Sequence, residues 1–271
     1  MNRRTTLIGA AALPMLLAAA PRRARAQAAG CADSLVGVKA RGKLLAGVKF
    51  DTPPFGYLDD NNQPAGFDLD LMRAVAAHIG VAVEFVKVTS VSRIPMLLSG
   101  NADLIAASMT HTRERGHAID FSETYYTGGQ SLLVKKDSPI AGVGDLAGKR
   151  VAVQQGTTLE KTIERLAPAA QVTAFRDYDA AWLALAQGRA DVLTGSLTIL
   201  QGFAGHNEGF KIVGGLLSTE PFGVGIRKGD WTMRDAVDDT LQDLWLSGEY
   251  AELYKARLGT EPTTPIEVWP A

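Results

Sequence analysis

The sequence has little cysteine and almost no net charge. One of its 271 residues is cysteine, and 28 lysines and arginines nearly balance 29 aspartates and glutamates. A lone thiol excludes an intramolecular disulfide and a thiolate metal cluster, and the four histidines show no metal-ligand spacing. No long basic or acidic block follows the first 25 residues, so no metal, cofactor or nucleic acid is predicted as a partner. The composition, 46% hydrophobic and 21% charged, is that of an ordinary globular protein and favours a small molecule as ligand.

The N-terminus predicts export. Arg3 and Arg4 precede an apolar stretch at 7–20, which is too short to cross a bilayer core of roughly 30 Å but suits a secretory signal. We therefore expect residues 1–28 to be a signal peptide and the protein to be periplasmic. The paired arginines resemble the twin-arginine signal, although Thr6 stands where that signal prefers an aromatic or large apolar residue.

The only cysteine, Cys31, directly follows this segment. It stands after Ala-Ala-Gly, where a lipoprotein would be lipidated, but Ala28 occupies the position at which such signals normally have leucine. Both an inert thiol, which the pattern favours, and a lipidated one stay open.

Beyond residue 40 short β-rich runs alternate with amphipathic helices, a pattern that predicts an α/β protein with parallel sheets covered by helices. Strands are expected at 44–48, 83–88, 104–107, 151–154 and 192–194. Helices are expected at 68–79, 92–98, 158–166, 179–186, 233–246 and 249–258. The 68–79 helix is the clearest, because its apolar residues recur at helical spacing and Gly80 is placed to end it in a left-handed conformation.

Two internal echoes indicate two similar lobes. Residues 97–105 and 185–193 follow the same pattern, in which the end of a helix is followed by a capping glycine and then by a buried strand. Residues 132–139 and 223–230 both read as strands that leave a lobe through basic residues and a turn, as hinge crossings would. The predicted organisation is listed by residue range: 40–134 plus 224–259 for a discontinuous first lobe, 139–220 for a second lobe, and 260–271 for a C-terminal tail.

Small hydroxyls, glycines and long cations follow the predicted strands. In open α/β sheets ligands bind beyond the carboxyl ends of strands, where loops and helix N-termini present free N–H groups. Such residues follow strands in both halves of the chain: Lys49, Asp51, Ser90, Arg93, Ser108, Thr110, Arg115, Gly156, Thr157, Thr158 and Ser196. This set is suited to binding a carboxylate.

Several runs carry a family resemblance. They are Gly66-Phe-Asp-Leu-Asp70, Asp103-Leu-Ile-Ala-Ala-Ser-Met-Thr-His-Thr-Arg-Glu-Arg115, Ala118-Ile-Asp-Phe-Ser122 with Tyr125-Tyr126, Val151-Ala-Val-Gln-Gln-Gly-Thr-Thr158 and Phe222-Gly-Val-Gly-Ile226. Over residues 40–259 the chain resembles the periplasmic polar amino acid-binding proteins, solute-binding protein family 3 of ABC transporters. The resemblance implies a type II periplasmic binding protein fold, with two Rossmann-like lobes joined by a two-strand hinge that closes around the ligand.

The resemblance also implies roles for individual residues. Arg115, which closes a Thr-x-x-Arg turn, falls where the family grips the ligand α-carboxylate, and Arg113 is expected to face solvent. Ser108, Thr110 and Thr158 fall at ligand contacts. The chemistry of these groups supports the same roles, because a guanidinium binds a carboxylate bidentately and a helix N-terminus adds partial positive charge.

The side-chain end of the site resembles that of acidic amino acid binders. There Ser90 and Arg93 match residues that hold a distal carboxylate, and Lys49 falls where those proteins place a basic residue. Aromatic walls are expected from Phe50, Phe55, Tyr57 and Tyr178. Asp68 and Asp70 read as helix N-terminal caps rather than ligand groups.

Ser196 departs from the family, which usually has an aspartate there to pair with the ligand α-ammonium. A serine hydroxyl cannot neutralise that charge. Either Asp51 or Glu220 takes over this role, or the ligand has no amine and is a dicarboxylate or another organic acid.

Three functions compete. The first is a monomeric binding protein that delivers an acidic or polar amino acid to an ABC permease. The second is an enzyme resembling cyclohexadienyl dehydratase, which would need an acid positioned over the ligand; none is better placed than Glu220 or Asp51. The third is a sensor, which the lack of a transmembrane helix after residue 259 disfavours. We expect transport rather than catalysis.

Overall fold

The computed structural model of the protein describes residues 33–205 and 207–270. Its first large sheet has five strands. Its strands, in spatial order, are β5 (Ala82–Lys87), β1 (Lys43–Val48), β6 (Leu104–Ile105), β13 (Glu220–Arg227) and β7 (Ile119–Gly128). The predicted signal peptide and Cys31 lie outside the described residues.

The second sheet repeats this plan. Its strands, in order, are β10 (Gln171–Phe175), β9 (Arg150–Gln154), β11 (Val192–Ser196), β8 (Gln130–Lys135) and β12 (Phe210–Val213). A small third sheet joins β2 (Asp51–Thr52), β3 (Gly56–Leu58) and β4 (Pro64–Ala65). We call the first sheet with its helices the first lobe, and the second sheet with its helices the second lobe.

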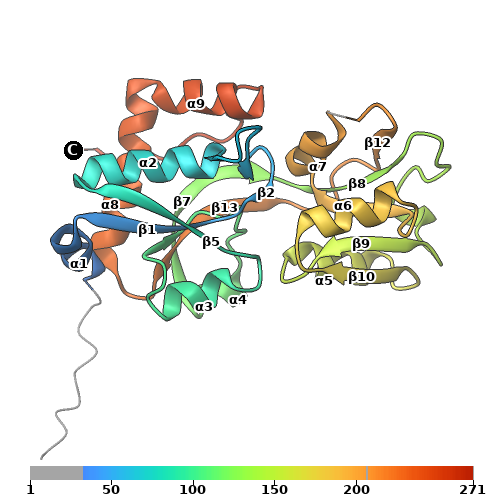
Figure 1. Ribbon diagram of the computed structural model, residues 1–271, viewed down its shortest axis with the longest axis horizontal. Coiled ribbons are helices and arrows are strands. Elements are labelled where there is room, and N and C mark those ends of the chain that lie inside the picture. The colour runs from blue at the N-terminus through green and yellow to red at the C-terminus, as the bar shows by residue number, and fades with distance from the viewer. Residues whose placement is uncertain (1–32, 206, 271) are drawn as a thin grey trace, which may run out of the picture. The chain divides into compact units, whose positions relative to one another are not determined.

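Helices cover both large sheets (Figure 1). Those of the first lobe are α1 (Ser34–Arg41), α2 (Phe67–Ile79), α3 (Arg93–Leu98), α4 (Arg113–Gly116), α8 (Trp231–Ser247) and α9 (Glu249–Leu258). Those of the second lobe are α5 (Thr158–Leu166), α6 (Tyr178–Ala186) and α7 (Leu197–Ala204), preceded by a 3₁₀ turn at Val143–Asp145.

Helix α2 forms for the reasons that the sequence indicates. Its apolar residues Leu71, Met72, Val75 and Ile79 are all buried. Gly80 ends it in the left-handed region at φ 77°, which a residue with a Cβ adopts only at a cost. The strands and helices predicted from periodicity are all present, most within one or two residues of the expected bounds.

The sheets are mixed rather than purely parallel. Strand β1 pairs in parallel with β5 and β6, whereas β13 is antiparallel to β6 and β7. In the second sheet β9 pairs in parallel with β10 and β11, and β8 is antiparallel to β11 and β12. The antiparallel members are the strands that enter and leave each lobe, and β7 escaped prediction because polar residues interrupt its apolar pattern.

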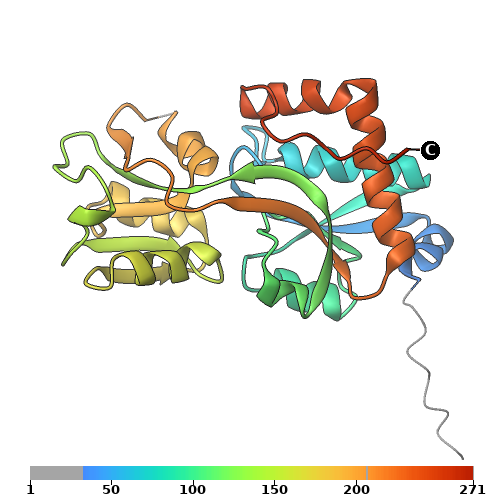
Figure 2. The same cartoon turned by 180° about the vertical axis from the view of Figure 1, so that it is seen from behind.

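Two extended segments pass between the sheets (Figure 2). One is β7 followed by β8, which changes sheet at Gly129; the other returns from β12 to β13. A Cβ on Gly129 would lie 2.4 Å from the carbonyl oxygen of Ser218, so the two segments approach too closely for a side chain. Strand β8 pairs within the second sheet, although the sequence placed residues up to 134 in the first lobe. The exact lobe boundaries stay a prediction.

Candidate functional site

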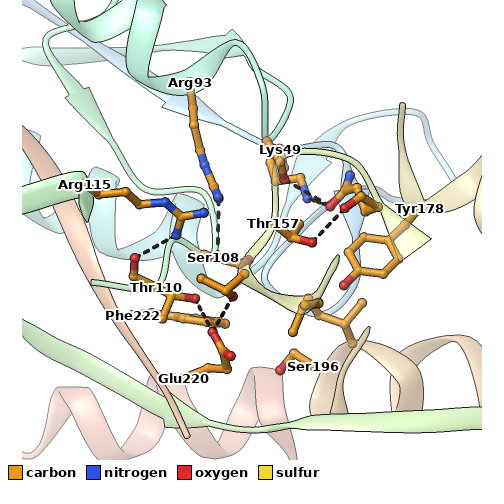
Figure 3. A pocket seen from close by; sticks show the side chains of 15 residues that line it. Lys49, Arg93, Ser108, Thr110, Arg115, Thr157, Tyr178, Ser196, Glu220 and Phe222 are labelled. Carbon is orange, nitrogen blue, oxygen red and sulfur yellow. Dashed lines mark hydrogen bonds between the residues drawn. The ribbon is translucent and has the colours of Figure 1, made fainter. Parts of the chain in front are cut away.

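A pocket of about 330 Å³ opens where strand ends of both lobes meet (Figure 3), and we call it the inter-lobe pocket. Ten of the residues predicted to contact a ligand line it: Lys49, Ser90, Arg93, Ser108, Thr110, Arg115, Thr157, Thr158, Tyr178 and Ser196. Five further residues complete the lining: Gln154, Leu159, Ile199, Glu220 and Phe222. The structure thus brings together side chains that lie up to 173 positions apart in the chain (Lys49 to Phe222).

The strand-end rule explains this convergence. Lys49 follows β1, and Ser108 and Thr110 follow β6. In the second lobe Gln154 is the last residue of β9 and Ser196 the last of β11. Parallel strands of one sheet end at the same edge, so their following residues gather there.

Arg115 lies at one end of the pocket (Figure 3). Thr112 is the N-cap of its helix α4, and the Thr112 Oγ1 accepts a hydrogen bond from the Arg115 amide. Its Nη1 donates to the carbonyl of Thr110 at 2.8 Å, and its Nη2 donates across to Gly156 of the second lobe at 3.2 Å. A guanidinium has five N–H donors, so these bonds fix its plane and leave donors for a ligand. Arg113 is exposed, as expected.

Arg93 and Lys49 are buried rather than solvated, with exposed fractions of 2% each. The Nη1 of Arg93 donates to the carbonyl of Ala107 at 2.8 Å. Burial lowers the pKa of Arg93, and the neighbouring Arg115 lowers it further. Burial also lowers the pKa of Lys49, from 10.5 to about 8, although Asp51 acts in the opposite direction.

Lys49 belongs to a network that joins the lobes. Its Nζ donates to Gln154 Oε1 at 2.6 Å and lies 3.7 Å from Asp51 Oδ1. The Gln154 Nε2 donates to Asp51 Oδ2 at 2.8 Å, and the Tyr178 amide donates to the same oxygen at 2.9 Å. Asp51 therefore lies behind the lining and does not face the inter-lobe pocket.

Glu220 is the carboxylate that lines the pocket. It is 3% exposed, and its Oε2 accepts hydrogen bonds from Thr110 Oγ1 at 2.5 Å and Thr158 Oγ1 at 2.7 Å. Its Oε1 accepts from Ser218 Oγ at 2.8 Å. Of the two acids that the sequence offered in place of the missing aspartate, Glu220 is the one in position.

Ser196 lies beside this acid in the lining, as Figure 3 shows. Its Oγ is buried and has no hydrogen-bond partner among the described residues. A buried hydroxyl without a partner is costly, so this atom is available to a ligand.

Asp68 has a role that sequence reasoning missed. It is fully buried in the first turn of α2, where its Oδ2 accepts from the Ser108 amide at 2.8 Å and its Oδ1 accepts from the Tyr125 hydroxyl at 2.8 Å. The expected N-cap role is wrong, since Gly66 is the N-cap of α2. Burial raises the pKa of Asp68 to about 6. The carboxylate holds Ser108 at φ 46°, in the left-handed region, and so shapes the lining.

The companion acid Asp70 pairs instead with two arginines. It lies 2.5 Å from Arg73 Nη1 and 2.6 Å from Arg257 Nε. This contact joins α2 to α9 and does not face the pocket.

The aromatic wall differs from the expected one. Of the four predicted aromatics only Tyr178 lines the pocket, and Phe222 joins it. Phe55 is fully buried and packs edge-on against Tyr126 and Phe222, at centroid distances of 4.8 and 5.5 Å. Phe55 therefore supports the wall from behind. The sequence feature that could have predicted Phe222 as a lining residue is its place in the glycine-rich segment that crosses between the lobes.

Within 33–205 and 207–270, no three histidine, cysteine, aspartate or glutamate side chains gather in a way that could hold a metal ion. A separate search of those residues found no helix with the length and apolar character needed to cross a membrane.

Comparison with known proteins identifies the family. The model of the bacterial extracellular solute-binding proteins, family 3, matches residues 44–260. The chain belongs to this family. It is 37% identical over 235 residues to "ABC transporter glutamine-binding protein GlnH" of Bacillus subtilis (strain 168), covering 85% of this chain and 86% of that one. It is 39% identical over 201 residues to the "Glutamine-binding protein" of Geobacillus stearothermophilus, covering 72% and 77%.

Solved structures of this family share the fold. A mutant of ArgBP from T. maritima superposes with a TM-score of 0.81 at 34% identity, covering 84% of this chain and all of that one. The ancestral amino acid-binding protein AncCDT-1, described as a precursor of cyclohexadienyl dehydratase, gives 0.79 at 35% identity, covering 83% and 99%. The protein is thus a member of solute-binding protein family 3 with the type II periplasmic binding protein fold, as expected.

Proposed function

We propose that this protein binds a neutral polar amino acid, with glutamine as its best candidate, and delivers it to an ABC permease outside the cytoplasm. The observation that carries this proposal is the inter-lobe pocket itself, which has a cation and hydroxyls at one end, a carboxylate on its floor and polar side chains at the other end. It accords with the relatives named as glutamine-binding proteins.

The α-amino acid head group fits the Arg115 end. Arg115 would take the α-carboxylate through its remaining N–H donors, as a bidentate guanidinium does. Glu220 would take the α-ammonium, because it is the carboxylate in the lining and its position is fixed by Thr110 and Thr158. The free hydroxyl of Ser196 is a further partner for the head group. An amine-bearing ligand is therefore favoured over a simple dicarboxylate.

The charge balance argues for a neutral side chain. Six charged groups gather in the lining or directly behind it: Lys49, Arg93, Arg115, Asp51, Asp68 and Glu220. Three are cationic and three anionic, so a zwitterion with an uncharged side chain leaves the buried site neutral. Glutamate would add a buried negative charge and arginine a positive one, and an unbalanced buried charge is expensive.

The side chain of the ligand would point toward Lys49, which Figure 3 places with Tyr178 at the end away from Arg115. Lys49 donates and Ser90 Oγ can accept, so the two match the carbonyl and amide groups of a glutamine side chain. Glutamate is the second choice, since Lys49 can also pair with a carboxylate.

Calorimetry tests this proposal. We expect glutamine to bind more tightly than glutamate, and arginine to bind weakest of the three. Arg115→Ala should weaken glutamine binding by about a hundredfold or more, because two charge-assisted hydrogen bonds are worth roughly 3 kcal/mol or more. Arg113→Ala, an exposed neighbour on the same helix, is the matched control and should bind as the unaltered protein does. Unchanged affinity in Arg115→Ala would contradict the assignment.

Catalysis is the second candidate because of the likeness to AncCDT-1. A dehydratase needs an acid free to transfer a proton to the ligand. Glu220 already accepts hydrogen bonds from three hydroxyls of the protein, so both of its carboxylate oxygens are engaged by the lining and its neighbours. We therefore propose a binding protein that acts as a monomer, and turnover of a cyclohexadienyl carboxylate by the purified protein would reverse this view.

A further inference from the structure

One amide closes the side-chain end of the inter-lobe pocket. Gln154, the last residue of β9, has an exposed fraction of 0%. Its Oε1 accepts from Lys49 Nζ at 2.6 Å and from Ser90 Oγ at 3.1 Å, and its Nε2 donates to Asp51 Oδ2 at 2.8 Å. Lys49 and Ser90 follow strands of the first lobe and Asp51 begins the small third sheet, whereas Gln154 belongs to the second lobe. The position of this side chain is therefore fixed from across the cleft.

A second pocket lies behind this amide, and we call it the side pocket. It has a volume of about 670 Å³, which includes space open to solvent, and it is lined by five charged residues, Asp51, Lys87, Arg176, Asp177 and Asp179, together with Val88 and Thr89. Asp51 lines the side pocket and accepts the hydrogen bond from Gln154. Two other lining residues, Thr89 and Asp177, are each followed in the chain by a residue of the inter-lobe pocket. The wall between the two pockets is thus formed by Gln154 on the side of the inter-lobe pocket and by Asp51 behind it.

The wall limits the length of the ligand. A side chain that ends at Gln154 leaves the cross-lobe hydrogen bonds intact. A longer one has to displace the amide, which breaks three hydrogen bonds and leaves the buried Lys49 and Asp51 without their common partner. Hydrogen bonds lost at buried charged groups are costly, so the penalty acts specifically against longer ligands.

We propose that Gln154 is a specificity-determining residue that separates the inter-lobe pocket from the side pocket and so restricts the ligand to a side chain of about glutamine's length. The inference rests on the proposed function. It predicts that a shorter residue at position 154 extends the inter-lobe pocket toward Asp51 and the side pocket and admits longer neutral amino acids, whose extra atoms would take the place of the amide.

Calorimetry with glutamine and citrulline tests this, because citrulline is also neutral and polar but longer. The measured quantity is the ratio of the citrulline Kd to the glutamine Kd. We expect that ratio to fall by about tenfold or more in Gln154→Ala and in Gln154→Thr, a difference of roughly 1.4 kcal/mol. Two shortened variants are used so that the ratio can be measured if one of them fails to fold.

Gln154→Met is the matched control. It keeps the length of the side chain and loses its hydrogen bonds, so overall affinity should drop while the ratio stays near that of the unaltered protein. An unchanged ratio in both shortened variants, or an equal fall in Gln154→Met, would overturn the inference while leaving glutamine binding in place. If the unaltered protein fails to bind glutamine, the proposed function fails first and this inference with it.

Discussion

Lys49 carries a charge that the fold does not stabilise fully. It is almost completely buried, and Asp51 compensates only part of the desolvation, so its pKa falls to about 8. The group is therefore cationic at neutral pH and loses its proton within a range that is accessible to binding experiments. The affinity for a ligand with a distal carboxylate depends on this proton, whereas the affinity for a ligand with a neutral amide depends on it little.

We predict that selectivity depends on pH through Lys49. Raising the pH from 7 to 9 takes Lys49 from mostly protonated to mostly neutral, so glutamate should lose affinity relative to glutamine by up to about tenfold. The ratio of the two Kd values, measured by calorimetry, cancels the titration of the shared α-amine. In Lys49→Met the ratio should not change with pH. A ratio that is flat in the unaltered protein would show that Lys49 does not face the ligand side chain.

At the residue scale the sequence predicted which residues lie near the pocket better than it predicted their hydrogen-bond partners. Strand ends and the family resemblance located most of the lining, because backbone topology alone brings those residues to one edge. Asp68 and Gln154 escaped because their roles depend on hydrogen-bond partners about 40 and 105 positions away. Asp51 and Phe55 were predicted as ligand contacts but lie behind the lining, because packing decides which side chains face the pocket and which support it.

At the scale of elements, the turn from β9 into α5 brings the lobes together. Gly156 in this turn has φ 76°, and a Cβ added there would lie 2.9 Å from Val91 Cγ2 and 3.2 Å from the backbone carbon of Ser90. Both neighbours belong to the first lobe. The glycine thus serves the local turn and also the close approach of the two lobes.

Gly156→Ala should separate these two roles. The left-handed conformation costs an alanine roughly 1–2 kcal/mol, and the contact with the first lobe adds a penalty only when the lobes meet. We expect glutamine affinity to fall by about tenfold or more, together with some loss of stability. Gly148→Ala is the control, since Gly148 has φ 71° and its Cβ would meet nothing within 4 Å. It should lose similar stability in urea unfolding and keep its affinity; equal affinity losses in both variants would contradict the prediction.

The elements themselves were predictable in unequal degree. Strong periodicity and a glycine cap defined α2 from sequence, and helix α5 followed from its polar start and apolar face. The mixed character of the sheets was not predicted, because it depends on β7 and β13, which run between lobes and carry glycines and polar residues. Residues 223–230 were expected to form a strand, but the pairing of β13 with β7 is a long-range contact that local propensity does not report.

At the scale of the whole molecule, ligand binding and lobe contact involve the same surfaces. Gln154 bridges to Lys49 and Asp51, and Arg115 reaches the carbonyl of Gly156. An exposed pair, Lys161 with Glu114 at 2.6 Å, spans the same gap farther out, and such a pair adds little stability in water. The buried contacts and the ligand therefore decide how often the lobes meet.

We predict that glutamine protects both lobes at once. With ligand at about 100 times its Kd, binding to the folded state alone raises the free energy of unfolding by roughly 2.7 kcal/mol. Hydrogen exchange should slow at amides of the first lobe near Ser90 and of the second lobe near Thr158 by more than the general slowing that the higher free energy of unfolding gives to α8, which does not line the pocket. Small-angle scattering should report a smaller radius of gyration with glutamine, as hinge closure requires, and no change for Arg115→Ala at the same ligand concentration. Protection confined to one lobe would mean that the ligand binds without bringing the lobes together, because a ligand held by only one lobe cannot restrain the other.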